Sequence, residues 1–140
     1  MGIDMQLQVS LDTNVWIFGL SGDNHFCETI LQNLHKFQVI IPSQIRKELN
    51  RNLSRNDMQR FYSFVKRPHV QLSYDDVPEI YITMFENKGL KKGDAIIGGF
   101  AEWKNIDTIV SDNRDFLKGL SEGHYFEVMS PQEFCESFDL

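Results

Sequence analysis

The sequence predicts an α/β fold in which a parallel β-sheet is covered by helices on both faces. Two observations point to it. Short runs rich in β-branched residues alternate along the chain with longer segments whose apolar residues recur at helical spacing. Residues that start or stop helices stand between the two kinds of segment. Strands that alternate with helices are joined by helical crossovers, and such strands lie parallel.

The first strand is expected at Leu7–Leu11, a short run typical of a buried strand. A helix is predicted at Thr13–Leu20, with Asp12 or Thr13 as its N-cap. After a turn, apolar residues at helical spacing extend over residues 26–37 and predict a second helix.

Residues 37–42 form the second expected strand, which ends in a proline. Ser43 then opens a helix, which residues 52–54 interrupt. A further helix carries apolar residues at helical spacing over residues 58–65, and the third strand is expected at residues 69–73.

The second half of the chain continues the alternation. Pro78 stands near the start of a helix and Gly89 just past its end, where these residues are favoured. Pro131 occupies the first position of a terminal helix in the same way. The other expected elements are a helix at residues 91–105, a strand at 106–112, a helical turn at 114–120, a strand at 125–130 and the terminal helix at 131–138.

The length of 140 residues predicts one domain, spanning residues 1–140, which is large enough for a hydrophobic core without metal or disulfide cross-links. The two cysteines, Cys27 and Cys135, make no disulfide framework, so free thiols in a reducing compartment are expected. The N-terminal residues lack the pattern of a signal peptide, and no apolar run reaches membrane-spanning length. The expected location is the cytoplasm.

The charge is distributed unevenly along the chain. The net charge is −6, yet residues 46–67 hold seven of the fourteen basic residues and only two acids. That window therefore carries +5 and the remainder −11. A solvated helical face explains such a run on its own. Beside an acidic pocket, the same run would form a basic surface suited to a polyanion.

Acidic residues directly follow two of the predicted strands. Asp12 and Asp112 would lie at the carboxyl edge of the sheet, where ligands bind in open α/β folds. Each acid has an ordinary explanation when taken alone. Asp12 can cap a helix, Asp94 favours a positive helix terminus, Glu48 can pair with a nearby arginine, and Asp112 and Asp115 suit a turn.

Together, acids from four separated segments could meet at this edge. Carboxylates crowded in one pocket repel one another and raise one another's pKa values. A hard divalent cation relieves that repulsion, and Mg²⁺ is held by one or two carboxylates together with water and substrate phosphate oxygens. The acids as a group therefore indicate a metal site.

Four segments carry a family resemblance: LDTNVW at residues 11–16, IPSQIRKEL at 41–49, KKGDAIIGGFAEW at 91–103 and IVSDNRDFL at 109–117. In order, spacing and placement they resemble the PIN-domain ribonucleases, which include the toxin components of VapBC toxin–antitoxin pairs. The resemblance implies a three-layer PIN-like fold with a central parallel β-sheet of four to five strands and helices on both faces. It also implies an endoribonuclease that uses one or two Mg²⁺ or Mn²⁺ ions.

Carried over residue by residue, the family's first three acids match Asp12, Glu48 and Asp94. The resemblance implies that Asp12 and Asp94 bind metal directly. Glu48 is expected to bind metal through water or to help activate the attacking water. Asn14 is similar to residues that hydrogen-bond to the carboxylates and orient them.

The fourth acid departs from the family pattern. Many members have an acid two residues after the Ser or Thr of the last segment, and counting from Ser111 that position is Asn113. Asp112 is the preferred fourth catalytic acid and metal ligand, because it leaves the strand first. Asp115 is the alternative, and participation of both stays open. Ser111 and Asn113 are expected to orient the carboxylates.

The resemblance also gives the basic residues a role, because those flanking the acids could follow an RNA backbone. It further implies a homodimer and, for a toxin, an antitoxin protein as partner. The expected RNA-binding residues are Arg46, Lys47, Arg51, Arg55, Lys91 and Lys92.

Other function classes fit less well. Phosphoryl-transfer proteins resembling haloacid dehalogenases need an acid two residues after Asp12, where this chain has Asn14. The histidines show no zinc-binding pattern, and no phosphate-binding glycine motif occurs. The main alternative is a catalytically silent PIN-like domain that binds RNA or a protein.

Overall fold

The computed structural model describes residues 6–113, 116 and 124–140. Its centre is a sheet in which the described strands are all parallel and follow the order β3-β2-β1-β4-β5. This confirms the predicted α/β class and the parallel sheet. The strands are β1 (Gln8–Leu11), β2 (Gln38–Ile41), β3 (Val70–Leu72), β4 (Thr108–Val110) and β5 (Glu127–Met129).

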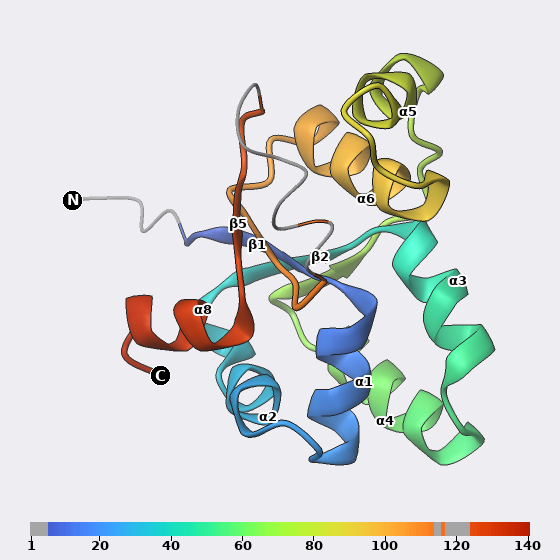
Figure 1. The fold of residues 1–140 in the computed structure, drawn as a ribbon. Coiled ribbons are helices and arrows are strands. Elements are labelled where there is room, and N and C mark those ends of the chain that lie inside the picture. Colours follow the sequence, from blue (N-terminus) through green and yellow to red (C-terminus); the bar gives the residue numbers. More distant parts are fainter. Residues whose placement is uncertain (1–5, 114–115, 117–123) are drawn as a thin grey trace.

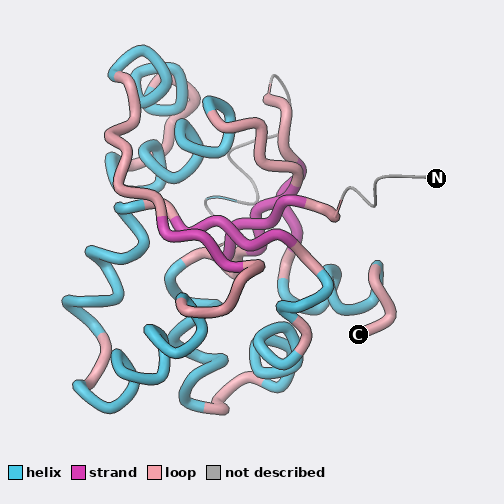
Figure 2. The backbone as a smooth tube through the Cα atoms, turned by 180° about the vertical axis from the view of Figure 1, so that it is seen from behind, coloured by secondary structure: helices cyan, strands magenta, loops and turns pink. Residues whose placement is uncertain are grey.

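Helices cover the sheet on both faces, which gives the predicted three layers (Figures 1 and 2). Helices α5 and α6 lie on one side, and α1, α2 and α4 lie on the other, with α8 beside α2. The helices are α1 (Thr13–Ser21), α2 (His25–Gln32), α3 (Ser43–Asn52), α4 (Arg55–Val65), α5 (Glu79–Glu86), α6 (Lys92–Trp103) and α8 (Pro131–Ser137).

The helix predicted over residues 26–37 is shorter than expected. α2 ends at Gln32, and a 3-10 turn, η1 (Leu34–Lys36), leads into β2. Asn33 ends the helix because its backbone N–H donates to Ile30 O and its Nδ2 donates to Thr29 O at 2.7 Å. The helical turn predicted at residues 114–120 falls almost wholly outside the described residues.

The register of the sheet sets the position of the site. Strand β1 lies between β2 and β4, and Leu11 pairs with Val110. The next residues, Asp12 and Ser111, therefore leave the sheet side by side at its carboxyl edge. No helix in the described part of the chain is long and apolar enough to cross a membrane.

Two adjacent glycines allow α5 and α6 to pack closely. A Cβ at Gly99 would lie 3.1 Å from the backbone of Tyr81, and a Cβ at Gly98 would lie 3.1 Å from the ring of Phe85. This contact packs α6, which carries Asp94, against α5. The glycine pair in the middle of α6 thus serves helix packing.

We predict that Gly99→Ala destabilises the fold more than Gly98→Ala. The Cβ at residue 99 meets backbone atoms that cannot rotate away, whereas the Phe85 ring near residue 98 can shift. The expected cost at residue 99 is about 1–3 kcal/mol in the free energy of unfolding, measured by urea denaturation. Equal stability of the two variants would contradict the packing argument.

Candidate acidic site

Asp12 ends β1 and caps α1. Its backbone N–H continues the sheet by donating to Val110 O at 2.9 Å. Its Oδ1 accepts from the backbone N–H of Thr13 at 2.8 Å, and its Oδ2 accepts from Ser111 Oγ at 2.7 Å. The residue is only 6% exposed. The carboxylate is therefore held from both neighbouring segments in one orientation.

Glu48 reaches the same place from α3. Its Oε1 accepts from Thr13 Oγ1 at 2.5 Å, and its Oε2 accepts from Gln44 Nε2 at 2.8 Å. Thr13 thus bonds to both acids, through its backbone to Asp12 and through its hydroxyl to Glu48. A Cβ at Gly93 would lie 3.2 Å from Glu48 Oε2, so glycine there lets the first turn of α6 approach this carboxylate.

Asp94 comes from that first turn of α6. Its Oδ2 accepts from Asn113 Nδ2 at 3.2 Å. Asn113 is positioned in turn because its backbone N–H donates to Ser111 Oγ at 3.1 Å. Ser111 therefore connects the segment that holds Asp94 to Asp12.

These side chains surround one cavity of about 210 Å³. It lies at the carboxyl edge of the sheet, where the N-terminal turns of α1 and α6 approach α3. Three carboxylates from three segments share it, as the sequence predicted for Asp12, Glu48 and Asp94. The lining residues are Asp12, Thr13, Asn14, Ile17, Glu48, Asn52, Asp94 and Asn113.

The environment raises the pKa of Asp12 to about 6. Burial is the largest cause, and the negative charges of Asp94 and Glu48 raise the pKa further. The hydrogen bonds from Ser111 and Thr13 act in the opposite direction, because they stabilise the ionised carboxylate. The cavity is thus a place where negative charge is costly and a cation would be stabilised.

The expected fourth acid lies differently from the first three. Asp112 is not among the lining residues, and its Oδ1 is buried with no hydrogen-bond partner among the described residues. It lies near Cys27, whose thiol has a pKa raised to about 12 by burial and, to a smaller extent, by the charge of Asp112. Asp115 lies outside the described residues. The roles of both acids stay predictions.

The cavity also contains residues that the sequence did not single out. Thr13 and Asn52 lie one residue after Asp12 and one helical turn after Glu48, respectively. Sequence position could have identified both residues, because Thr13 is adjacent to one candidate acid and Asn52 lies at helical spacing from another. Ile17, one turn after Thr13, gives the cavity an apolar wall.

The expected RNA-binding residues divide between two sides of α3. Successive helix residues are about 100° apart, so Arg51 lies about 60° and Lys47 about 100° from Glu48, both on the same side of it, whereas Arg46 lies about 160° from it. The Arg46 guanidinium lies over the ring of Tyr74, 5.7 Å from its centroid. Lys91, Lys92 and Arg55 are exposed at helix starts.

The residues of the cavity fit a cation that is shared with a substrate. Among the described residues, no three His, Cys, Asp or Glu side chains come close enough to hold an ion by themselves. The available donors are hard carboxylate oxygens, and Mg²⁺ needs only one or two of these beside water and phosphate oxygens. Asp12 and Asp94 can supply them.

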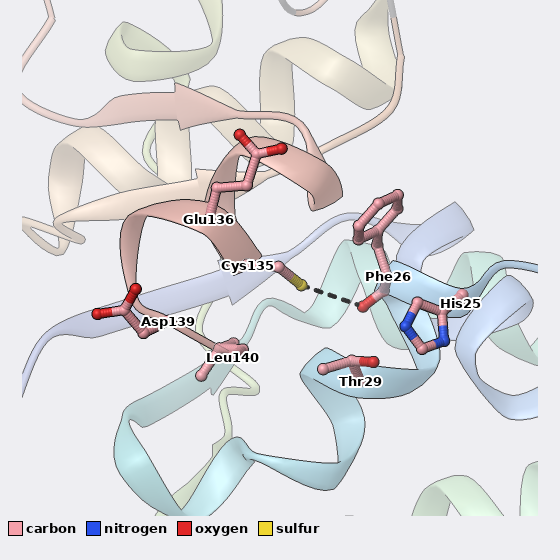
Figure 3. Close-up of a pocket in the computed structure, with 7 residues that line it drawn as sticks. All are labelled: His25, Phe26, Thr29, Cys135, Glu136, Asp139 and Leu140. Carbon is pink, nitrogen blue, oxygen red and sulfur yellow. Dashed lines mark hydrogen bonds between the residues drawn. The ribbon is translucent and has the colours of Figure 1, made fainter.

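A second cavity, of about 330 Å³, lies between α2 and α8 (Figure 3). The Cys135 thiol donates to Phe26 O at 3.5 Å there, and Glu136 and Asp139 stand at the α8 side. Burial raises the pKa of Cys135, which disfavours a nucleophilic thiolate. The acidic cavity is therefore the stronger candidate for chemistry.

We predict that Asp12→Asn stabilises the metal-free protein at neutral pH. An unfolded Asp titrates near 3.8 and native Asp12 near 6, so stability falls as pH rises through this interval. The buried charge then costs up to roughly 3 kcal/mol, and Asn removes it. Thermal unfolding should show a gain of about 1–3 kcal/mol at neutral pH that disappears below about pH 4.

The matched control is Asp76→Asn, which changes an exposed acid and should leave stability within about 0.5 kcal/mol. A loss of stability in Asp12→Asn at neutral pH would show that the hydrogen bonds to the ionised carboxylate outweigh its burial.

The sequence matches the PIN domain family over residues 9–119. No curated protein matches it. Among solved structures, it is similar to VapBC2 from Rickettsia felis bound to a promoter DNA fragment, with 18% identity, 89% of this chain and 98% of that chain covered, and a TM-score of 0.66.

Two further solved structures share the fold. DNA-bound VapBC from Salmonella typhimurium is 21% identical, over 89% of this chain and 98% of that chain, with a TM-score of 0.63. A toxin-antitoxin complex from Klebsiella pneumoniae is 20% identical, over 88% and 97%, with a TM-score of 0.62. The match to the family extends from β1 through α6 and β4, the elements that carry the acidic cavity, and the chain belongs to the PIN domain family.

Proposed function

We propose that this protein is a metal-dependent endoribonuclease that hydrolyses RNA phosphodiester bonds in the acidic cavity. The observation that carries the proposal is the meeting of Asp12, Glu48 and Asp94 in one cavity of a PIN-family chain. Two exposed basic residues near Glu48 on α3, Lys47 and Arg51, support a polyanionic substrate.

A Mg²⁺ or Mn²⁺ ion, one or two in number, would supply Lewis acidity to the scissile phosphate and lower the pKa of a water. Asp12 and Asp94 are the residues placed to bind it. Ser111 and Asn113 hold these two carboxylates in orientation, and Asn14 stands beside them. Asp112, or Asp115 in its place, is proposed as the fourth acid.

Glu48 is the residue best placed to handle the proton. Thr13 and Gln44 each donate to one of its carboxylate oxygens, which fixes the side chain facing the cavity. In the proposed reaction Glu48 accepts a proton from the water that attacks phosphorus. Arg46, Lys47, Arg51, Arg55, Lys91 and Lys92 are proposed to contact the RNA backbone.

We further infer that the protein is the toxin of a toxin–antitoxin pair and acts in the cytoplasm, with an antitoxin protein as partner and a homodimer as the working form. Support comes from the similar solved structures, which are described as VapBC or toxin-antitoxin complexes. A catalytically silent PIN domain that binds RNA or protein is the second candidate, and the two experiments below separate them.

We predict that purified protein cleaves a mixed structured RNA pool with Mn²⁺ or Mg²⁺ and not with EDTA. Asp94→Asn should lower the rate roughly 100-fold or more, because a metal ligand supplies several kcal/mol of transition-state stabilisation. Glu86→Gln, an exposed acid on α5, is the matched control and should retain wild-type activity. Cleavage that persists in EDTA or in Asp94→Asn would contradict the proposal.

We also predict that Mn²⁺ raises the melting temperature of the wild type and not of Asp94→Asn, since an ion that binds only the native state stabilises it. The shift should shrink below pH 6, because protonated Asp12 must lose its proton to bind metal. Absence of any shift in the wild type, at concentrations that support cleavage by other metal nucleases, would favour the silent binding domain.

A further inference from the structure

One exposed face of α4 carries a row of basic and aromatic side chains at helical spacing. Arg55, Gln59, Tyr62 and Lys66 recur at steps of four, three and four residues, which places them within about 60° of one another on the helix. All four are exposed, and Tyr62 is 37% exposed. We name these four residues the α4 stripe.

The opposite side of α4 packs against α1 and holds the helix in place. Phe61 is fully buried and packs edge-on against Trp16 of α1, with ring centroids 5.0 Å apart. Tyr62 contacts the protein through its edge-on neighbour Phe61, at 5.4 Å between centroids. More than a third of Tyr62 stays exposed, so part of the residue is accessible to a ligand.

Other basic residues of α4 and its C-terminal turn have structural partners. Arg60 donates to Leu20 O and pairs with Asp57 at 3.5 Å. The Arg67 guanidinium lies over the Phe64 ring, 4.4 Å from its centroid. The cations of the stripe differ, because Arg55 and Lys66 make no side-chain hydrogen bond or ion pair with the described part of the chain.

The stripe is free of negative charge. Every residue of α4 is described, and its one acid, Asp57, lies about 200° from Arg55 and is engaged by Arg60. The window of residues 46–67 carries +5 in a chain whose remainder carries −11. A polyanion is therefore the charge-complementary occupant of this face.

The stripe also continues from the acidic cavity. Asn52, the last residue of α3, lines the cavity, and Arg55 begins α4 only three residues later. Figure 1 shows α4 following α3 after a sharp turn. An RNA chain that leaves the cavity past Asn52 would reach Arg55 first. From there α4 extends for about 16 Å.

We propose that the α4 stripe binds single-stranded RNA, with an unpaired base stacked on Tyr62 and backbone phosphates on Arg55 and Lys66. The inference rests on the proposed function and adds a binding surface outside the acidic cavity. An aromatic ring binds any base through its face, but only where the base is not stacked in a duplex. Gln59, between the two cations and beside the ring, adds a neutral hydrogen-bonding group.

The test is binding without cleavage. Fluorescence anisotropy in EDTA measures the affinity of the full chain for a labelled RNA that has no secondary structure, and for the same RNA in a duplex. Tyr62→Ala should weaken binding of the single strand by about fivefold or more, while Tyr62→Phe keeps wild-type affinity, because stacking needs the ring and not the hydroxyl. Tyr125→Ala, an exposed tyrosine at the other edge of the sheet, is the matched control.

A second variant avoids the contact with Phe61. Arg55→Gln with Lys66→Gln changes only exposed side chains, and it should weaken binding and flatten the dependence of log affinity on log salt by roughly 1.4. Melting temperatures of all variants establish that they are folded.

The inference is overturned by wild-type affinity in either the Tyr62→Ala or the double variant, or by equal loss of single-strand and duplex binding. Binding of a poly-glutamate peptide as tight as that of RNA would also overturn it, since the surface would then serve an acidic protein. Failure of metal-dependent cleavage with Tyr62-dependent RNA binding intact would remove the proposed function alone.

Discussion

The buried carboxylate of Asp12 is the interaction on which the rest of the site depends. It stands at the end of the central strand, where Ser111 from β4 and Thr13 from α1 both donate to it. These two bonds compensate in part for a burial that raises the pKa of Asp12. Because Thr13 also binds Glu48, the position of α3 is coupled to the same carboxylate. The sheet register thereby determines where the other acids can stand.

The second constraint on the site is that acidic side chains are inside the cavity while basic side chains are outside it. Crowding three carboxylates in one cavity lowers the stability of the metal-free protein, and the chain offsets the repulsion with neutral donors from Thr13, Gln44, Ser111 and Asn113. The cations stay at the rim and on the exposed helices. A positive group inside the cavity would relieve the repulsion permanently and would compete with a divalent cation. Cations outside it can instead attract a polyanion toward an acidic centre.

The sequence was sufficient to predict the order of the helices and strands, because strand and helix periodicities differ. It was also sufficient to predict that three acids lie close together, because strand ends share one edge of the sheet. It was not sufficient for the fourth acid, which stays a prediction at Asp112 or Asp115. Asn113 donates to Asp94 Oδ2 and lines the cavity, whereas Asp112 is not among the lining residues. The early end of α2 depended on side-chain bonds of Asn33 that periodicity does not reveal.

The amide of Asn113 has a physical consequence for the cavity. A carboxylate at this position would place a fourth negative charge near Asp94 and Asp12, and would raise the pKa of Asp12 further. The amide instead donates to Asp94 Oδ2, so it orients the carboxylate and adds no charge. The cavity can therefore keep its acids in place without a cation present. A fourth carboxylate would make the same arrangement depend more strongly on bound metal, because only a cation could then offset the added repulsion.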